Sequence, residues 1–210
     1  MINFSNRKPI YFPYASVVLA LAFLVFLIIT EFTQYQDRLM GLYAIHTKTY
    51  WPLIQQQPFE LLRLITALFL HGNWLHWIIN SSIFLLLAFS IERVIGWQKF
   101  SFVFLTTGMM GNLLASWFLQ GQDNLLIGAS GGVSGLIGMW LVMFPQKKIN
   151  FILPIGLYMQ KTSMPLAVVI VLWLVVQIIL QFQPQPSYDI AWISHITGFA
   201  TGFLLAWFVK

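Results

Sequence analysis

Long apolar runs alternate with short polar segments along this 210-residue chain. The runs cover about residues 14–30, 74–91, 100–119, 129–144, 165–182 and 191–209. A helix needs roughly 20 apolar residues to cross the hydrocarbon core of a bilayer. The pattern therefore predicts an all-α polytopic membrane protein with six transmembrane helices. The fourth run is short for a full crossing, which fits a helix that begins below the outer surface.

The segment between the first two runs has a different composition. Residues 31–63 mix aromatic residues with glutamine, single charges and two prolines. Amphipathic rings settle at the depth of the lipid headgroups, and proline interrupts helices. We expect a long first loop of short helical pieces lying in the membrane interface. A second segment, residues 151–159, is apolar but contains Pro154 and Gly156, so it is expected to be part of the connection between the fourth and fifth helices.

Composition narrows the class of protein further. Hydrophobic residues make up 59% of the chain and charged residues 8%, whereas globular domains carry about 25% charged residues. We therefore interpret residues 1–210 as one membrane domain, with a short N-terminal segment at 1–13 and no separate soluble module. The absence of cysteine excludes disulfides, thiolate metal sites and a cysteine nucleophile. The net charge of +5 comes from scattered basic residues, so it does not indicate nucleic-acid binding.

The basic residues instead predict the orientation in the membrane. Six crossings place both termini on one side, together with the loops that hold most of the lysines and arginines. The residues on that side are Arg7, Lys8, Arg93, Lys99, Lys147, Lys148, Lys161 and Lys210, against Arg38, Lys48 and Arg63 on the other. Cytoplasmic loops carry the basic excess, so we expect cytoplasmic termini and Ser130 near the outer end of the fourth helix.

Ser130 stands among small residues where the fourth helix begins. Gly128, Gly131, Gly132 and Gly135 surround it in the sequence. Such a stretch fits a packing face, on which small residues let helices approach closely. It equally fits a nucleophile that needs space and amide donors beside it. The stretch alone leaves both interpretations open.

The sixth helix carries a matching pattern. Ser194, Gly198 and Gly202 form a ladder of small residues with a spacing of four, as glycines do on the fourth helix. Two such faces can pack backbone to backbone, which would bring His195 over Ser130. Each ladder alone favours packing, but a serine and a histidine at matching depth favour chemistry. A neutral His195 could take the proton of Ser130 and later return it to a leaving amine.

Polar residues at the start of the second helix are candidate hydrogen-bond donors. His76 and Asn80 are four residues apart, so both side chains point the same way on a helix. Together with the Ser130 backbone N–H at a helix N-terminus, they could stabilise an oxyanion. His71 would lie about 140° from His76 if the helix extends so far. We interpret His71 as a residue that holds the loop to the helix.

Other chemistries fit less well. No His-Glu-x-x-His motif is present, and neither a metal nor another cofactor is expected. A two-aspartate intramembrane protease needs aspartates within the spans, whereas Asp123 and Asp189 fall in loops. Asp189 is disfavoured as the third member of a triad, because it precedes His195 by six residues and lies outside the helix. No span has a charge at its middle, which disfavours a channel or transporter.

Three separated motifs, from about Pro58 onward, resemble those of the rhomboid family of intramembrane serine proteases. They are Arg63…His71…His76…Asn80, then Gly128-Ala129-Ser130-Gly131, and last His195-Ile196-Thr197-Gly198 with Gly202. The resemblance implies a six-helix bundle around a short, central fourth helix, with a long membrane-embedded first loop. It also implies a Ser130–His195 catalytic dyad without an aspartate. The implied oxyanion-stabilising residues are His76, Asn80 and Ser130, and the implied supporting residues are His71, Gly128 and Gly131.

Two positions depart from the family pattern. Leu62 stands where a tryptophan often precedes the arginine of the first motif, so a different anchoring of the first loop is expected. Ser134 stands where an aromatic residue often packs on the catalytic histidine. The His195 ring is therefore expected to be held less firmly, or by another group.

The resemblance implies a serine endopeptidase that hydrolyses peptide bonds in or near the transmembrane segments of membrane-protein substrates. The expected partners are those substrates and the lipid bilayer, with no nucleic acid, and the expected location is a bacterial inner membrane. The alternative is a catalytically inactive rhomboid-like protein that binds membrane clients for quality control. Such proteins usually lack the serine or the histidine, and this chain has both.

Overall fold

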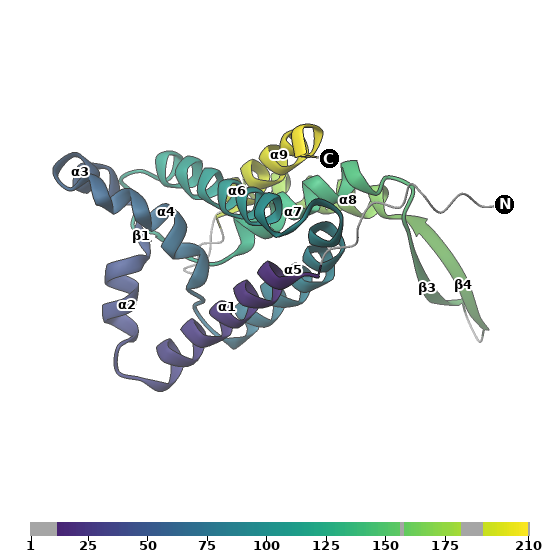
Figure 1. Cartoon of the computed structure of the whole chain (residues 1–210), viewed down its shortest axis with the longest axis horizontal. Coiled ribbons are helices and arrows are strands. Elements are labelled where there is room, and N and C mark those ends of the chain that lie inside the picture. Colours follow the sequence, from purple (N-terminus) through teal and green to yellow (C-terminus); the bar gives the residue numbers. More distant parts are fainter. Residues whose placement is uncertain (1–11, 156–157, 182–190, 210) are drawn as a thin grey trace.

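The computed structural model describes residues 12–155, 158–181 and 191–209. It is mostly helical, and a helix occupies each of the six predicted apolar runs (Figure 1). These helices are α1 Tyr14–Phe32, α5 Trp74–Ile95, α6 Trp97–Phe118, α7 Ser130–Met143, α8 Leu166–Gln181 and α9 Trp192–Val209. By length and composition, α1, α5 and α9 can cross a membrane. The predictions that used Arg7, Lys8, Asp189 and Lys210 concern residues outside the described ones.

The first loop is built of short helical pieces, as expected. Its elements are α2 Gln36–Tyr43, β1 Ile45–His46, α3 Tyr50–Gln56, the 3-10 turn η2 Pro58–Leu62, α4 Arg63–Thr66 and the 3-10 turn η3 Ala67–Phe69. Strand β1 pairs in antiparallel fashion with β2, Leu125–Leu126, just before α7. This short pairing ties the first loop to the segment that leads into Ser130.

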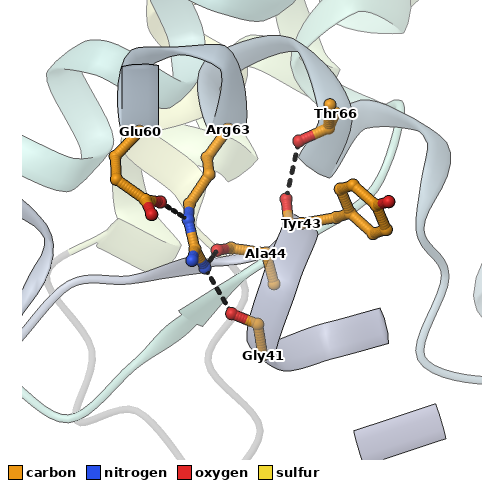
Figure 2. A network of polar contacts seen from close by, with 6 residues as sticks. All are labelled: Gly41, Tyr43, Ala44, Glu60, Arg63 and Thr66. Atoms are coloured by element: carbon orange, nitrogen blue, oxygen red, sulfur yellow. Dashed lines mark hydrogen bonds and ion pairs between the residues drawn. The ribbon is translucent and has the colours of Figure 1, made fainter. Parts of the chain in front are cut away.

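Arg63 fastens this loop from within (Figure 2). Its Nη1 donates hydrogen bonds to the backbone oxygens of Gly41, at 2.6 Å, and Ala44, at 2.9 Å, and its Nε forms an ion pair with Glu60. The flanking Leu62 is largely exposed. The carbonyl groups at the end of α2 thus receive charge-assisted hydrogen bonds, which are stronger than neutral ones. Arg63 is therefore a polar anchor of the first loop, and it directly follows Leu62.

The connection between α7 and α8 forms a β-hairpin. Strands β3, Lys148–Ile155, and β4, Tyr158–Pro165, pair in antiparallel fashion over their whole length. The hairpin extends away from the helices, at the end of the molecule opposite α2 and α3 (Figure 1). A connection was predicted at residues 151–159, and the fold is mostly helical as predicted, but this hairpin departs from an all-α class. Pro154 and Gly156 disfavour a helix, and strand pairing satisfies backbone groups in its place.

Helix α7 is short and central. Its 14 residues span about 21 Å at 1.5 Å per residue, less than the roughly 30 Å hydrocarbon core. Ten of its residues are buried, and it contacts α5, α6, α8 and α9. The expected short fourth helix inside a bundle is therefore present.

Glycines bring α7 and α9 into backbone contact. A Cβ added at Gly198 would lie 2.1 Å from the Gly131 carbonyl oxygen, and one added at Gly202 would lie 1.9 Å from that of Gly135. Residue numbers rise together along the two helices at these contacts, so α7 and α9 run parallel. The ladders inferred from the sequence therefore do pack on one another, with the N-terminal ends of both helices at the same level.

Helix α1 is attached to α5 at two levels. In the core, the Phe23 ring packs edge-on against Phe84 with 5.3 Å between centroids, and both side chains are fully buried. At the start of α1, the buried Glu92 carboxylate accepts hydrogen bonds from the backbone N–H groups of Ala15, at 2.8 Å, and Ser16, at 2.7 Å. The Ser16 hydroxyl donates to the same carboxylate. A negative charge at a helix N-terminus is favourable, because unpaired N–H groups and the helix dipole meet it there.

Candidate active site

Ser130 is the first residue of α7, with Ala129 as the N-cap. Helix geometry leaves the first N–H groups of α7 without intrahelical acceptors, and the Ser130 N–H is one of them. The preceding turn is shaped by Gly128, whose φ of +107° lies in the region that L side chains rarely adopt. The start of α7 thus offers a hydroxyl and free N–H groups together.

His76 lies directly against this turn. A Cβ added at Gly128 would stand 2.8 Å from both Cε1 and Nε2 of the His76 imidazole. Only glycine leaves room for the ring there and also accepts the backbone angle. The structure therefore brings His76, Gly128 and the N-terminus of α7 together, as the sequence predicted.

The start of α5 positions His76 and Asn80. Asn73 is the N-cap, and its Oδ1 accepts a hydrogen bond of 2.8 Å from the His76 N–H, which begins the helix at Trp74. Asn80 is buried, and its Nδ2 donates to the His76 carbonyl oxygen at 3.0 Å. One of its two amide hydrogens is thus used within α5, and the other is free for a further acceptor. Asn73 was missed from the sequence, although asparagine before an apolar run is a helix-start signal.

His71 does not continue the helix. It lies before Asn73 in the segment between η3 and α5, and its ring is edge-on to His76 with 5.2 Å between centroids. The 140° separation would hold only on a helix that extends back to His71. His71 is 1% exposed and also packs edge-on to Phe23, so it joins the first loop to α1 and α5.

Acid is expected to destabilise the folded protein through His71. Its pKa is lowered from 6.5 to about 3, chiefly by burial and secondarily by the neighbouring His76. As the pH falls below about 6.5, His71 binds a proton in the unfolded chain, whereas in the folded state it stays neutral until about pH 3. The stability from neutral His71 is therefore complete above the unfolded pKa and is lost on acidification. We expect the free energy of unfolding to fall by about 1.4 kcal/mol per pH unit between about pH 6 and pH 4 from this group.

Thermal unfolding in detergent at a series of pH values measures this loss. The control is His71→Phe, which keeps a ring in the pocket and cannot titrate, while the three other histidines are present in both proteins. The wild type should lose stability more steeply than the variant below pH 6. Equal slopes would contradict the assignment.

His195 lies in the first turn of α9 and is held by two neighbours. Its Nδ1 is 2.6 Å from Oε1 of Gln177 on α8, and its ring is edge-on to Trp192 with 5.7 Å between centroids. Ser134 Oγ donates a hydrogen bond of 2.7 Å to the Ser130 carbonyl oxygen within α7. The contacts with His195 that the sequence left open are therefore supplied by Gln177 and Trp192.

The contacts of Ser194, which precedes His195, show that this turn of α9 packs against α7 and α6. A Cβ added at Gly131 would lie 2.7 Å from Ser194 Oγ, as would one added at Gly111 of α6. Ser194 and Gly198, one helical turn apart, thus both contact Gly131. His195 stands on that same turn, beside the first residues of α7.

Gln177 was not predicted as a site residue, although the sequence contained a signal for it. A glutamine within an apolar helix costs free energy unless it is hydrogen-bonded, and Gln177 lies within the apolar run 165–182. The candidate site also offers little to a metal. Among residues 12–155, 158–181 and 191–209, no three His, Asp or Glu side chains lie together as a set that could hold an ion.

Comparisons with known proteins identify the family of this chain. A family model described as the Rhomboid domain matches residues 58–210. "RHOMBOID-like protein 4" of Arabidopsis thaliana is 33% identical over 143 residues, which cover 68% of this chain and 32% of that protein. "Putative rhomboid protease YdcA" of Bacillus subtilis (strain 168) is 36% identical over 84 residues, covering 40% and 42%. "Inactive rhomboid protein 1" of Danio rerio is 26% identical over 149 residues, covering 71% and 16%.

The matched parts make up less than half the length of each of these relatives. Their names include both a protease and an inactive protein. The match to the family model covers well over half of this chain and includes His76, Ser130 and His195. The chain therefore belongs to the rhomboid family, and it is an integral membrane protein.

Proposed function

We propose that this protein is an intramembrane serine endopeptidase with Ser130 as nucleophile and His195 as general base. The observation that carries the proposal is the parallel backbone contact of α7 with α9. Gly131 follows Ser130 directly, and Gly198 follows His195 by less than one turn. The contact between Gly131 and Gly198 therefore supports the proposal that the Ser130 hydroxyl and the His195 imidazole lie at the same end of the two helices and react together.

The chemistry needs a proton acceptor beside the hydroxyl. Serine is a weak nucleophile until a base removes its proton. His195 Nδ1 is engaged by Gln177, which leaves Nε2 as the atom to accept that proton. Ser130 Oγ then attacks the scissile carbonyl carbon, and the imidazolium protonates the leaving amine as the C–N bond breaks. Water, activated in the same way, hydrolyses the acyl-enzyme and restores both residues.

The negative oxygen of the tetrahedral intermediate needs donors. The Ser130 N–H at the start of α7 and the His76 ring beside Gly128 are suited to this role. The remaining amide hydrogen of Asn80 is the third candidate. Loss of one such donor typically costs about 3 kcal/mol of transition-state stabilisation.

We further propose six membrane crossings with both termini in the cytoplasm of a bacterium-like cell. The basic residues favour this orientation, with the β3–β4 hairpin inside and the first loop outside. The β3–β4 hairpin and the first loop lie at opposite ends of the molecule, which is compatible with this orientation (Figure 1). Substrates would then be transmembrane proteins cut near the outer face. A helix hides its carbonyl groups in hydrogen bonds, so helix-weakening residues near the cut should favour cleavage.

Covalent labelling tests the proposal. Detergent-purified wild-type protein is incubated with a fluorophosphonate probe, and the modified serine is located by mass spectrometry, alongside cleavage of a model transmembrane substrate. We expect the adduct on Ser130 and cleavage of the substrate. Labelling confined to another serine would overturn the assignment. An inert protein in lipid as well as detergent would favour the client-binding alternative.

A further inference from the structure

Gln177 is a polar residue in an otherwise apolar stretch of α8. The helix reads LAVVIVLWLVVQIILQ, and Gln177 is only 5% exposed. Burying an amide among apolar side chains costs free energy unless the amide is hydrogen-bonded. Its Oε1 lies 2.6 Å from Nδ1 of His195, a residue on the next helix. This hydrogen bond offsets the free-energy cost of burying the Gln177 amide, and it links α8 to the candidate active site.

The orientation of the Gln177 amide sets which nitrogen of His195 carries the proton, because the amide oxygen accepts and the amide NH₂ donates. In the structure the Oε1 atom faces Nδ1, and with this orientation Nδ1 donates its N–H to it. In a neutral imidazole, Nε2 then holds the free lone pair. A general base for Ser130 needs this tautomer, because the lone pair must face the hydroxyl proton. The other tautomer would point an N–H at the serine and could not take its proton.

We propose that Gln177 is a positioning residue that holds His195 in the Nδ1–H tautomer and fixes the direction of its ring. The proposal rests on the proposed function, because it assigns the orienting role in the same catalytic pair. A neutral amide here does what a carboxylate does in a three-residue serine protease site. It orients the ring without adding a buried charge.

Few other groups can influence the titration of His195. Helices α7 and α8 carry no titratable side chain, and α6 carries only Lys99, which lies by Val209 at the far end of α9. His76 on α5 is the titratable group at the candidate site, and both variants of residue 177 described below retain it. A change in pH dependence at residue 177 can thus be attributed to its contact with His195.

Kinetics of two variants separate positioning from packing. Gln177→Leu keeps the size of the side chain but removes the acceptor, so kcat should fall about 10- to 100-fold with KM nearly unchanged. Gln177→Glu restores an acceptor and adds a charge that stabilises the imidazolium. It should retain activity at neutral to alkaline pH, with the acidic limb of the pH profile shifted upward by about one unit. The control is Ile170→Ala, which shortens an equally buried side chain of α8.

A spectroscopic measurement tests the tautomer without catalysis. The chain has four histidines, so ¹⁵N-histidine spectra are simple to assign with single His→Ala variants. We expect His195 to be protonated at Nδ1 in the wild type and to lose this preference in Gln177→Leu. This readout separates the two proposals. A wild type with the Nδ1–H tautomer but no cleavage would overturn the proposed function alone.

Other results would overturn the role of Gln177. They are unchanged kcat in Gln177→Leu, an equal loss in Ile170→Ala, identical pH profiles for wild type and Gln177→Glu, or an Nε2–H tautomer in the wild type. If Gln177→Leu does not fold, the pH profile of Gln177→Glu and the wild-type spectrum still decide the question.

Discussion

Ser130→Ala is expected to abolish cleavage of a transmembrane substrate, with a loss on the order of 10⁶-fold that takes the rate below detection. The variant removes the atom that attacks the carbonyl carbon, so what remains is the donors and the binding site without a covalent step. Folding should be preserved, because Ala129 and not Ser130 is the N-cap of α7, and alanine fits the smaller space without a clash. Cleavage of a purified substrate and thermal unfolding, measured on the same preparation, check both parts.

Ser134→Ala is the matched control. Ser134 lies on the same helix one turn later, is 2% exposed, and its hydroxyl donates a hydrogen bond to the Ser130 carbonyl oxygen. Its removal should leave cleavage within a few-fold of the wild type. If Ser130→Ala cleaves and Ser134→Ala does not, the nucleophile has been misassigned. If both variants retain activity, neither serine is the nucleophile.

Gly202→Ala is expected to separate α9 from α7 and to lower the free energy of unfolding by about 3 kcal/mol. The added Cβ would lie 1.9 Å from the Gly135 carbonyl oxygen and 2.7 Å from its Cα. These atoms belong to the backbone, so no side-chain rotation can relieve the overlap and the helices must move apart. Thermal unfolding in detergent should show a large decrease, and cleavage should be lost as well, because His195 is carried by α9.

Gly41→Ala provides the comparison. Gly41 lies in α2, and nothing stands within 4 Å of a Cβ added there. Alanine favours helix by about 1 kcal/mol over glycine, so this variant should be as stable as the wild type or more so. A Gly202→Ala protein that unfolds at the wild-type temperature would show that the two backbones are not in the contact described.

The helices of this protein could be predicted from the apolar runs, because span length is a strong constraint in a membrane. The pairing of α7 with α9 could also be inferred, since two ladders of small residues have few other partners. The hairpin could not be, because a short apolar run broken by Pro154 does not distinguish strand from irregular loop. The β3–β4 pairing depends on contacts between residues of the two strands.

The candidate site shows the same division. His76 and Asn80 follow from helical spacing, whereas the position of His71 depends on where α5 begins, and Asn73 sets that start. The contact of Gln177 with His195 depends on the rotation of α8 about its own axis. The spacing of 18 residues between them contains no information on that rotation. Only the three-dimensional packing of α8 on α9 shows which polar atom meets Nδ1.

The contact of Glu92 with the start of α1 joins a helix outside the family match to one inside it. The matched segment begins at residue 58, and α1 lies entirely before it. Yet Glu92, inside that segment, is fully buried and binds the N–H groups of Ala15 and Ser16. A chain shortened to the matched segment would lose these donors and would also lose the packing of Phe23 on Phe84. The packed unit of this protein therefore includes α1 and is larger than the segment that the family model matches.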